Sequence, residues 1–223
     1  ASDFEKAFIA RLVDPTSAFG YDSVSLSLDS PAFKSPDEAY SLQWVDRDFG
    51  IARLYLPNLL DHMLDYLARD WPLLRADAPL KTLIIDLRDS AGGDRETLHN
   101  LLARFLPAGT LAYTLKDRQG QESEVRVKAS TTPSEPTDLA LIVLTSKKTR
   151  GSAELLAGAL QANKRALVIG EPTAGMAGHK RIIKLARDRS LLLSAAWPRF
   201  AGQTEFNEPV EPDTPVSATS SID

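Results

Sequence analysis

Three side chains with the chemistry of a serine hydrolase lie in two short segments of the sequence. Ser152 supplies a hydroxyl at the expected start of a helix, and His179 and Lys180 are candidate bases after the next expected strand. A serine nucleophile needs a base within about 3 Å of its hydroxyl and N–H donors that stabilise the oxyanion. The amides of Gly92, Gly93 and Ser152 are the candidate donors for this oxyanion hole, because paired glycines at a strand-to-helix turn allow close backbone approach.

Each of these residues also has an ordinary structural interpretation. A serine in the first turn of a helix can use its hydroxyl to satisfy backbone N–H groups there. His179 can be a loop or strand-start histidine with no part in catalysis. The Gly92–Gly93 pair can be a tight turn in which Asp94 caps the following helix. The residue types alone therefore leave both interpretations open.

Apolar runs of strand length lie between these candidates along the chain. Runs at 81–88, 139–145 and 165–170 predict strands, and the leucine spacing predicts helices at about 95–105 and 152–162. Continuous apolar runs joined by helices are typical of parallel strands that are covered on both faces. We therefore expect three adjacent parallel strands with the helices packed beside them and the candidate site at the carboxyl ends of the strands.

Other patterns predict elements around this unit. Alternating residues predict hairpins within 41–56, 110–129 and 179–196. A helix is expected from Pro57 to about Asp70, where Pro72 would stop it.

Near the amino terminus, apolar residues at helical spacing predict a short amphipathic helix over residues 3–13. Alternation over residues 24–28 is typical of an edge strand.

Composition restricts the class of protein. The 223 residues are 43% hydrophobic and 25% charged, which is sufficient for the core of one large domain or of one domain with a small appendage. A net charge of −4 and the lack of a long basic run argue against nucleic-acid binding. No apolar segment reaches the roughly 18 residues needed to cross a bilayer, and the chain does not open with a signal peptide pattern.

The sequence also predicts that no cofactor or metal is bound. The chain contains no cysteine, which excludes disulfides, thiol catalysis and cysteine-ligated zinc. Histidines and carboxylates do not cluster at the spacing of metal ligands. The Gly-x-Gly-x-x-Gly pattern of dinucleotide-binding proteins is absent.

Four sequence blocks occur in an order that resembles a known family. They are Leu83-Ile-Ile-Asp-Leu-Arg-Asp-Ser-Ala-Gly-Gly93, Ala153-Glu-Leu-Leu-Ala-Gly-Ala-Leu-Gln161, Arg165-Ala-Leu-Val-Ile-Gly-Glu-Pro-Thr173 and Val210-Glu-Pro-Asp213. Together they resemble the C-terminal processing peptidases, or tail-specific proteases, and their interphotoreceptor-retinoid-binding-protein-like relatives. The resemblance covers about residues 48–216, and the PDZ domain usual in the family has no counterpart in this sequence.

This resemblance implies a fold, a domain organisation and a location. The fold would be α/β of the ClpP/crotonase type, a spiral of strand-helix units with a mainly parallel core sheet and added hairpins. Residues 1–47 would form an N-terminal helix and edge segment, 48–216 the core domain and 217–223 a C-terminal tail. A periplasmic or secreted protein is favoured by the family, although the chain itself shows no signal peptide.

The resemblance also assigns positions to the catalytic residues, and there the sequence departs from the family. The family's nucleophilic serine lies three residues before the helix glutamate, Glu154, and its position is occupied by Gly151. The general-base lysine lies five residues after Glu171, where this chain has Met176. An acidic residue of many members falls on Ala162. A glycine cannot act as a nucleophile, and a thioether cannot accept a proton from a hydroxyl at neutral pH.

Two functions follow from these observations. We favour a family member that binds extended or unstructured polypeptide, including its C-terminus, and that is inactive or atypical because Gly151 and Met176 replace the family residues. The alternative is an active serine endopeptidase that uses Ser152 as nucleophile with His179 or Lys180 as base.

Overall fold

The computed structural model describes residues 33–34, 40–129, 139–184 and 190–216 of the 223-residue chain. The helix expected at 3–13, the strand expected at 24–28 and the tail at 217–223 lie outside these ranges. Within the described ranges, no helix combines the length and the apolar composition needed to cross a membrane.

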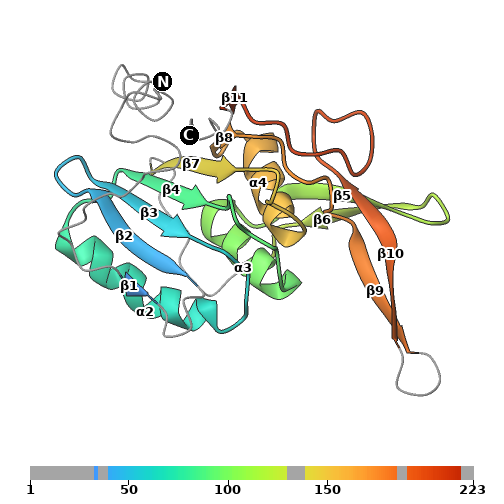
Figure 1. Ribbon diagram of the computed structural model, residues 1–223, viewed down its shortest axis with the longest axis horizontal. Helices are drawn as coiled ribbons and strands as arrows, with labels where there is room; N and C mark the ends of the chain where they lie inside the picture. Colours follow the sequence, from blue (N-terminus) through green and yellow to red (C-terminus); the bar gives the residue numbers. More distant parts are fainter. Residues whose placement is uncertain (1–32, 35–39, 130–138, 185–189, 217–223) are drawn as a thin grey trace, which may run out of the picture.

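A seven-stranded sheet, counted over the described residues, forms the centre of the fold (Figure 1). Its strands in spatial order are β1 (Phe33–Lys34), β2 (Ser41–Asp46), β3 (Ile51–Tyr55), β4 (Thr82–Asp86), β7 (Ala140–Thr145), β8 (Leu167–Gly170) and β11 (Thr214–Pro215). β4, β7 and β8 are adjacent and parallel, with Ile84 beside Ile142 in the β4–β7 pair. The predicted parallel arrangement is therefore confirmed, as is the α/β class with a mainly parallel core sheet.

Side chains that alternate along the central strands form two apolar faces. Leu83 and Ile85 of β4 belong to the main core, whereas Ile84 belongs to a second cluster on the opposite face of the sheet. All five residues of β4 are buried. Burial on both faces explains why the sequence shows a continuous apolar run here instead of an alternating one.

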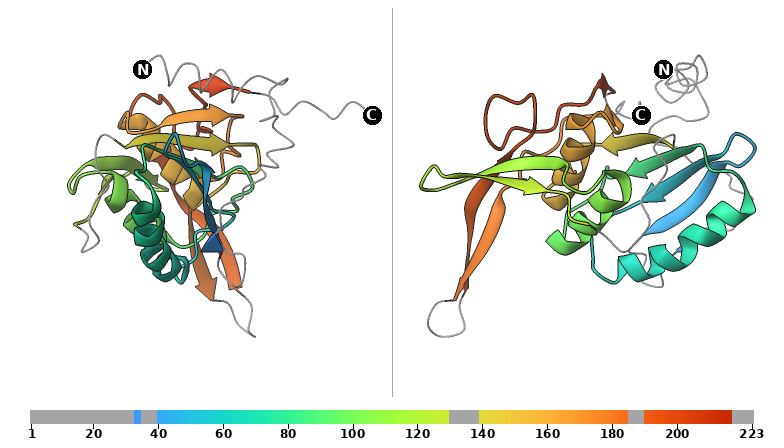
Figure 2. Two further views of the ribbon diagram at one scale, coloured as in Figure 1. Left: turned by 90° about the vertical axis from the view of Figure 1, so that its left-hand side faces the viewer. Right: turned by 180° about the vertical axis from the view of Figure 1, so that it is seen from behind.

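Three helices of the described chain cover one face of the sheet (Figures 1 and 2). They are α2 (Met63–Asp77), α3 (Arg95–Phe105) and α4 (Ser152–Ala162). α3 and α4 have the predicted bounds. The apolar side of each helix contributes to the main core, which explains the helical leucine spacing in the sequence.

The prediction for α2 was wrong at both ends. This helix begins at Met63 instead of Pro57, and it continues through Pro72 to Asp77. Proline removes one intrahelical hydrogen bond, which normally ends or kinks a helix. Here Trp71 and Leu74, on either side of the proline, are buried in the core, and their burial offsets the lost hydrogen bond.

An antiparallel sheet with four strands among the described residues lies beside α3 and α4 and extends away from the main sheet (Figures 1 and 2). Its order is β6 (Glu122–Arg126), β5 (Leu111–Asp117), β10 (Ser190–Arg199) and β9 (His179–Lys184). The β5–β6 and β9–β10 pairs are the predicted hairpins, and β2–β3 is the third. β9 is the edge strand of this sheet in the described part of the chain, and the β9–β10 hairpin projects from the body.

The main sheet extends across the domain boundary that the sequence resemblance suggests. β2 lies before residue 48, yet it pairs with β3 from Ser41↔Tyr55 to Asp46↔Ile51. Trp44 of β2 is buried, and its Nε1 donates to Asp77 at the end of α2, 2.9 Å away. Residues 40–47 are therefore structurally continuous with the core.

Candidate functional site

The turns that follow β4 and β7 meet at the carboxyl edge of the main sheet. Because these two strands are parallel neighbours, the segments that leave them start side by side. A Cβ placed on Gly92 would lie 2.7 Å from the Arg150 carbonyl oxygen and 2.9 Å from the Ser152 nitrogen. Gly92 also has a φ of +81°. Only glycine permits both this conformation and this close approach.

The structure thus brings Gly92, Gly93, Gly151 and Ser152 to one place, as the sequence suggested. The Gly93 side of the turn is anchored by Leu59, whose N–H donates to the Gly92 carbonyl at 2.9 Å and whose carbonyl accepts from the Asp94 N–H at 2.7 Å. Among the hydrogen bonds between described residues, none uses the N–H of Gly93 or Ser152. These amides can therefore donate to a ligand.

Gly151 forms a strained elbow at the start of α4. Its φ of 64° and ψ of −129° lie in a region that is costly for residues other than glycine. Hydrolases hold exposed nucleophiles on strained strand-to-helix turns of this kind. A Cβ on Gly151 would meet only the Ala91 oxygen at 3.7 Å and the Gly92 Cα at 3.8 Å, which are ordinary contact distances. The elbow therefore has room for a side chain that it does not carry.

Glu154, in the first turn of α4, connects the elbow to the loop that follows β8. Its buried carboxylate accepts four hydrogen bonds, from the Gly151 N–H (2.9 Å), the Met176 N–H (2.8 Å), the Gly175 N–H (2.7 Å) and the Thr173 hydroxyl (2.6 Å). A charged acceptor makes such bonds stronger than neutral ones. Glu154 consequently holds together the two segments that carry the family's nucleophile and base positions.

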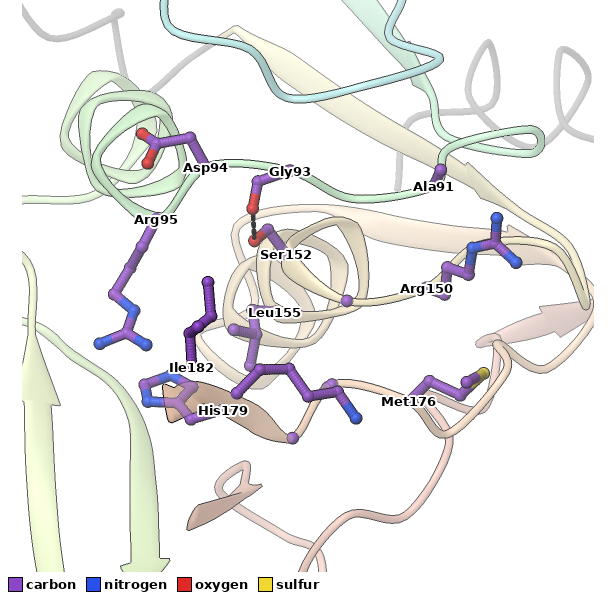
Figure 3. A pocket seen from close by; sticks show the side chains of 14 residues that line it. Ala91, Gly93, Asp94, Arg95, Arg150, Ser152, Leu155, Met176, His179 and Ile182 are labelled. Atoms are coloured by element: carbon purple, nitrogen blue, oxygen red, sulfur yellow. Dashed lines mark hydrogen bonds between the residues drawn. The ribbon is translucent and has the colours of Figure 1, made fainter. Parts of the chain in front are cut away.

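The Ser152 hydroxyl is bonded to a backbone carbonyl and not to a candidate base in this structure. Its Oγ donates to the Gly93 carbonyl oxygen at 2.8 Å (Figure 3). A nucleophilic serine would instead donate to a base. The contact ties the start of α4 to the Gly-Gly turn, which is the structural interpretation of this residue.

Neither candidate base contacts Ser152 among the described interactions. The His179 ring packs edge-on against the ring of Tyr113, with centroids 6.2 Å apart. Burial, assisted by the charges of Arg95 and His99, lowers the pKa of His179 to about 4. A histidine with this pKa is neutral at pH 7 but weakly basic. Lys180 Nζ donates to Ser194 Oγ at 2.9 Å on the neighbouring strand β10.

An open pocket with a volume of about 620 Å³ lies in front of these groups (Figure 3). It is lined by Ala91, Gly93, Asp94, Arg95, Arg150, Gly151, Ser152, Leu155, Met176, Ala177, Gly178, His179, Lys180 and Ile182. Met176 exposes 54% of its surface, so its side chain contributes a flexible apolar wall where the family resemblance places a lysine. All of the candidate catalytic residues from the sequence thus line one pocket without forming a catalytic hydrogen-bond chain.

Two important residues of the site were missed by sequence reasoning. Glu154 is the only acidic residue among the apolar residues 153–160, and this isolation was a usable signal for a buried, satisfied carboxylate. Arg95 gave no comparable signal, because only the tertiary structure places it in the pocket. Within the described residues, no group of three or more potential ligands could hold a metal ion.

Comparison with known proteins agrees with the sequence resemblance. Residues 60–216 match the description of Peptidase family S41. The chain is 32% identical over 140 residues to carboxyl-terminal-processing peptidase 2, chloroplastic, of Arabidopsis thaliana, which covers 61% of this chain and 26% of that protein. It is 32% identical over 113 residues to a carboxyl-terminal-processing protease of Synechocystis sp., covering 51% of this chain and 25% of that protein. The chain thus spans about a quarter of the length of these relatives.

Solved structures share the fold. A photosystem II D1 C-terminal processing protease superposes with a TM-score of 0.64 at 20% identity, covering 76% of this chain and 43% of that one. A lipoprotein from Streptococcus agalactiae superposes with a TM-score of 0.66 at 19% identity, covering 84% of this chain and 71% of that one. The matched family covers more than half of the sequence and the fold is the same, so this chain belongs to Peptidase family S41.

Proposed function

We propose that this chain is a polypeptide-binding member of the S41 family that does not hydrolyse peptide bonds. The observation that carries the proposal is the elbow at Gly151, which keeps the unusual backbone of a nucleophile turn but has no side chain. In serine hydrolases, loss of the nucleophile removes most of the rate enhancement. The base position, Met176, cannot compensate, because a thioether does not accept a proton at neutral pH.

Two features of the pocket support binding of an extended polypeptide. β9 pairs with β10 on one side, and His179, Lys180 and Ile182 of β9 line the pocket. An extended segment can add to the edge of such a strand through backbone hydrogen bonds. The unpaired amides of Gly93 and Ser152 then provide donors for a carbonyl or carboxylate of the bound chain. The relatives are named carboxyl-terminal-processing proteases, so C-terminal segments of polypeptides are the proposed ligands.

The geometry does not favour a peptidase that works through Ser152. That mechanism requires the hydroxyl to leave the Gly93 carbonyl and to reach His179 or Lys180. His179 is held against Tyr113, and its low pKa makes it a poor base. Lys180 is engaged with Ser194.

The test compares the unmodified chain, Ser152→Ala and Gly151→Ser/Met176→Lys. Cleavage of an unstructured polypeptide such as casein and labelling by a fluorophosphonate report activity, and fluorescence polarisation with labelled casein fragments reports binding. We expect the unmodified chain and Ser152→Ala to bind without cleavage or labelling. The double variant should be labelled at the new serine, because the elbow and the donors are already in place.

Two results would contradict the proposal. Cleavage by the unmodified chain that disappears in Ser152→Ala would establish the peptidase mechanism instead. Failure of the unmodified, folded chain to bind any of the polypeptides would remove the binding function.

A further inference from the structure

Two arginines of the pocket occupy positions that local helix energetics disfavour. Arg95 is the first residue of α3, and Arg150 immediately precedes Gly151, the N-cap residue of α4. The amino end of a helix carries partial positive charge, so cations there are unfavourable and anions are favourable. Natural sequences tend to violate such local rules at functional sites. Both side chains line the same pocket.

Neither guanidinium is neutralised within the described structure. Arg95 and Arg150 form no side-chain hydrogen bond or ion pair there, whereas Arg53 and Arg88 both bind the buried Asp86 carboxylate. Arg165 also has partners, since it donates to the carbonyl oxygens of Phe105 and Leu139. An unpaired arginine in a pocket is therefore available to a ligand.

Among the described residues that line the pocket, cationic side chains outnumber carboxylates. Its lining has three cationic side chains, those of Arg95, Arg150 and Lys180, and one carboxylate, that of Asp94. Asp94 caps α3: its Oδ2 accepts from the Thr97 N–H at 2.8 Å and from the Thr97 hydroxyl at 3.2 Å. The pocket is thus locally positive in a chain whose net charge is −4.

Arg95 lies where a bound polypeptide would pass. In Figure 3 its guanidinium extends from the start of α3 toward the side of the pocket that holds His179 and Ile182 of β9. The charge of Arg95 is one of the causes that lower the pKa of His179, which agrees with this placement. Arg95 is exposed, so a ligand can reach its guanidinium, and Leu155 and Ile182 add apolar surface to the same pocket.

We propose that this pocket selects polypeptide segments that carry an acidic side chain, which the unpaired guanidinium of Arg95 holds while the segment lies along β9. Arginine suits this task, because its planar fork can bind a carboxylate through two parallel hydrogen bonds. Arg150 and Lys180 contribute to the positive field that attracts such segments. The inference rests on the proposed function, since it names the class of polypeptide that the same site binds.

The test uses three fluorescein-labelled peptides of alternating serine and valine. The first carries a single glutamate, placed at successive positions in a series, and an amidated C-terminus. The second carries glutamine in place of the glutamate. The third carries glutamine and a free C-terminal carboxylate. Affinities are measured by fluorescence polarisation at low and high salt with the unmodified chain, Arg95→Gln and a control, Lys81→Gln.

Lys81→Gln is a suitable control because it removes one positive charge, as Arg95→Gln does, at a site away from the pocket. Lys81 is exposed and precedes β4, so it lies at the amino ends of the strands, opposite the edge that carries the pocket. We expect the unmodified chain and Lys81→Gln to prefer the best glutamate peptide roughly tenfold over its glutamine match. In Arg95→Gln the preference should fall to about twofold or less, and added salt should weaken it in the other two proteins.

Thermal unfolding separates this role from a structural one. Removing a cation from the amino end of α3 should leave the Tm unchanged or raise it, so weaker binding cannot be attributed to damage to the fold. The inference would be overturned if Arg95→Gln lowered the Tm and if its loss of glutamate preference were proportional to the fall in Tm. Arg95 would then have a structural role.

The remaining outcomes distinguish a failure of this inference from a failure of the proposed function. Equal affinity for the glutamate and glutamine peptides would overturn the acidic preference and leave the proposed function intact. Tight binding of only the third peptide, lost in Arg95→Gln, would mean that Arg95 recognises a chain terminus instead of a side chain, which also overturns the inference. If no peptide binds, both the inference and the proposed function fail.

Discussion

Replacement of Glu154 by glutamine tests the connection between the elbow and the loop after β8. The carboxylate accepts from Thr173 and Gly175 at Oε1 and from Gly151 and Met176 at Oε2. A glutamine has one oxygen and one NH2 group, so in either orientation two of the four donors face an amide nitrogen. A buried donor without an acceptor costs about 1–3 kcal/mol. The expected loss in the free energy of unfolding is therefore about 2–6 kcal/mol.

Urea unfolding followed by tryptophan fluorescence measures this loss as a lower midpoint at an unchanged m-value. Glu96→Gln is the matched control, because Glu96 is exposed in the first turn of α3 and its loss should cost only about 0.3–1 kcal/mol through the helix dipole. Since domains of ordinary size have about 5–15 kcal/mol of total stability, Glu154→Gln could unfold the chain. Thr173→Val then provides a variant that keeps the carboxylate; it removes one of the four bonds and also the bond that the Thr173 hydroxyl accepts from the Val210 N–H at 2.9 Å.

Hydrogen exchange gives a local readout of the same interaction. Relative to the unmodified chain, Glu154→Gln should increase the exchange rates of the Gly175 and Met176 amides more than those of the β4 amides. A midpoint shift no larger than that of Glu96→Gln, with unchanged exchange in the loop, would show that Glu154 does not hold the two segments together.

Two further predictions concern the elbow and His179. Gly151→Ser should lower the free energy of unfolding by about 1–3 kcal/mol through backbone strain alone, since its Cβ has room. Gly92→Ala should lower it more, because its Cβ would meet the Arg150 carbonyl oxygen at 2.7 Å. Urea unfolding of both variants would refute this order if Gly92→Ala were the milder one. For His179, the folded pKa of about 4 lies below the ordinary value of 6.5, so the unfolded chain takes up the proton first and stability falls between about pH 6.5 and pH 4. The loss is at most about 3 kcal/mol, because the ring is only partly buried. His179→Phe should lose correspondingly less stability over that pH range. Identical profiles of stability against pH for the unmodified chain and His179→Phe would contradict the low pKa of His179.

Sequence patterns were sufficient for the central architecture. Leu83, Ile84 and Ile85 form an unbroken apolar run because β4 is buried on both faces, and this pattern predicts a central parallel strand from the sequence alone. The bounds of α3 and α4 followed from leucine spacing that the core of the folded chain reproduces. The ordered motifs also placed the elbow at Gly151 and the paired glycines at the same site.

Local signals failed where tertiary burial opposed them. Pro57 and Pro72 suggested the wrong start and end for α2, because the propensity of a proline is a local property. The helix continues past Pro72 because Trp71 and Leu74 are buried, and it starts after Pro57 because Leu59 forms a bridge with Gly93 instead. Burial of two large side chains contributes about 1.5–3 kcal/mol each, which is comparable to the cost of a proline within a helix.

The chemistry of the site was decided by contacts between distant segments. The residue types named Ser152 as a nucleophile or as a structural hydroxyl, and only its bond to Gly93, 59 residues away in the sequence, supports the second interpretation. The four donors of Glu154 come from segments on both sides of β8, and Arg95 enters the pocket from a different helix than Ser152. Spacing along a chain specifies which residues share an element, but the direction of a side chain depends on the groups packed around it, and those groups are assembled only by the folded structure.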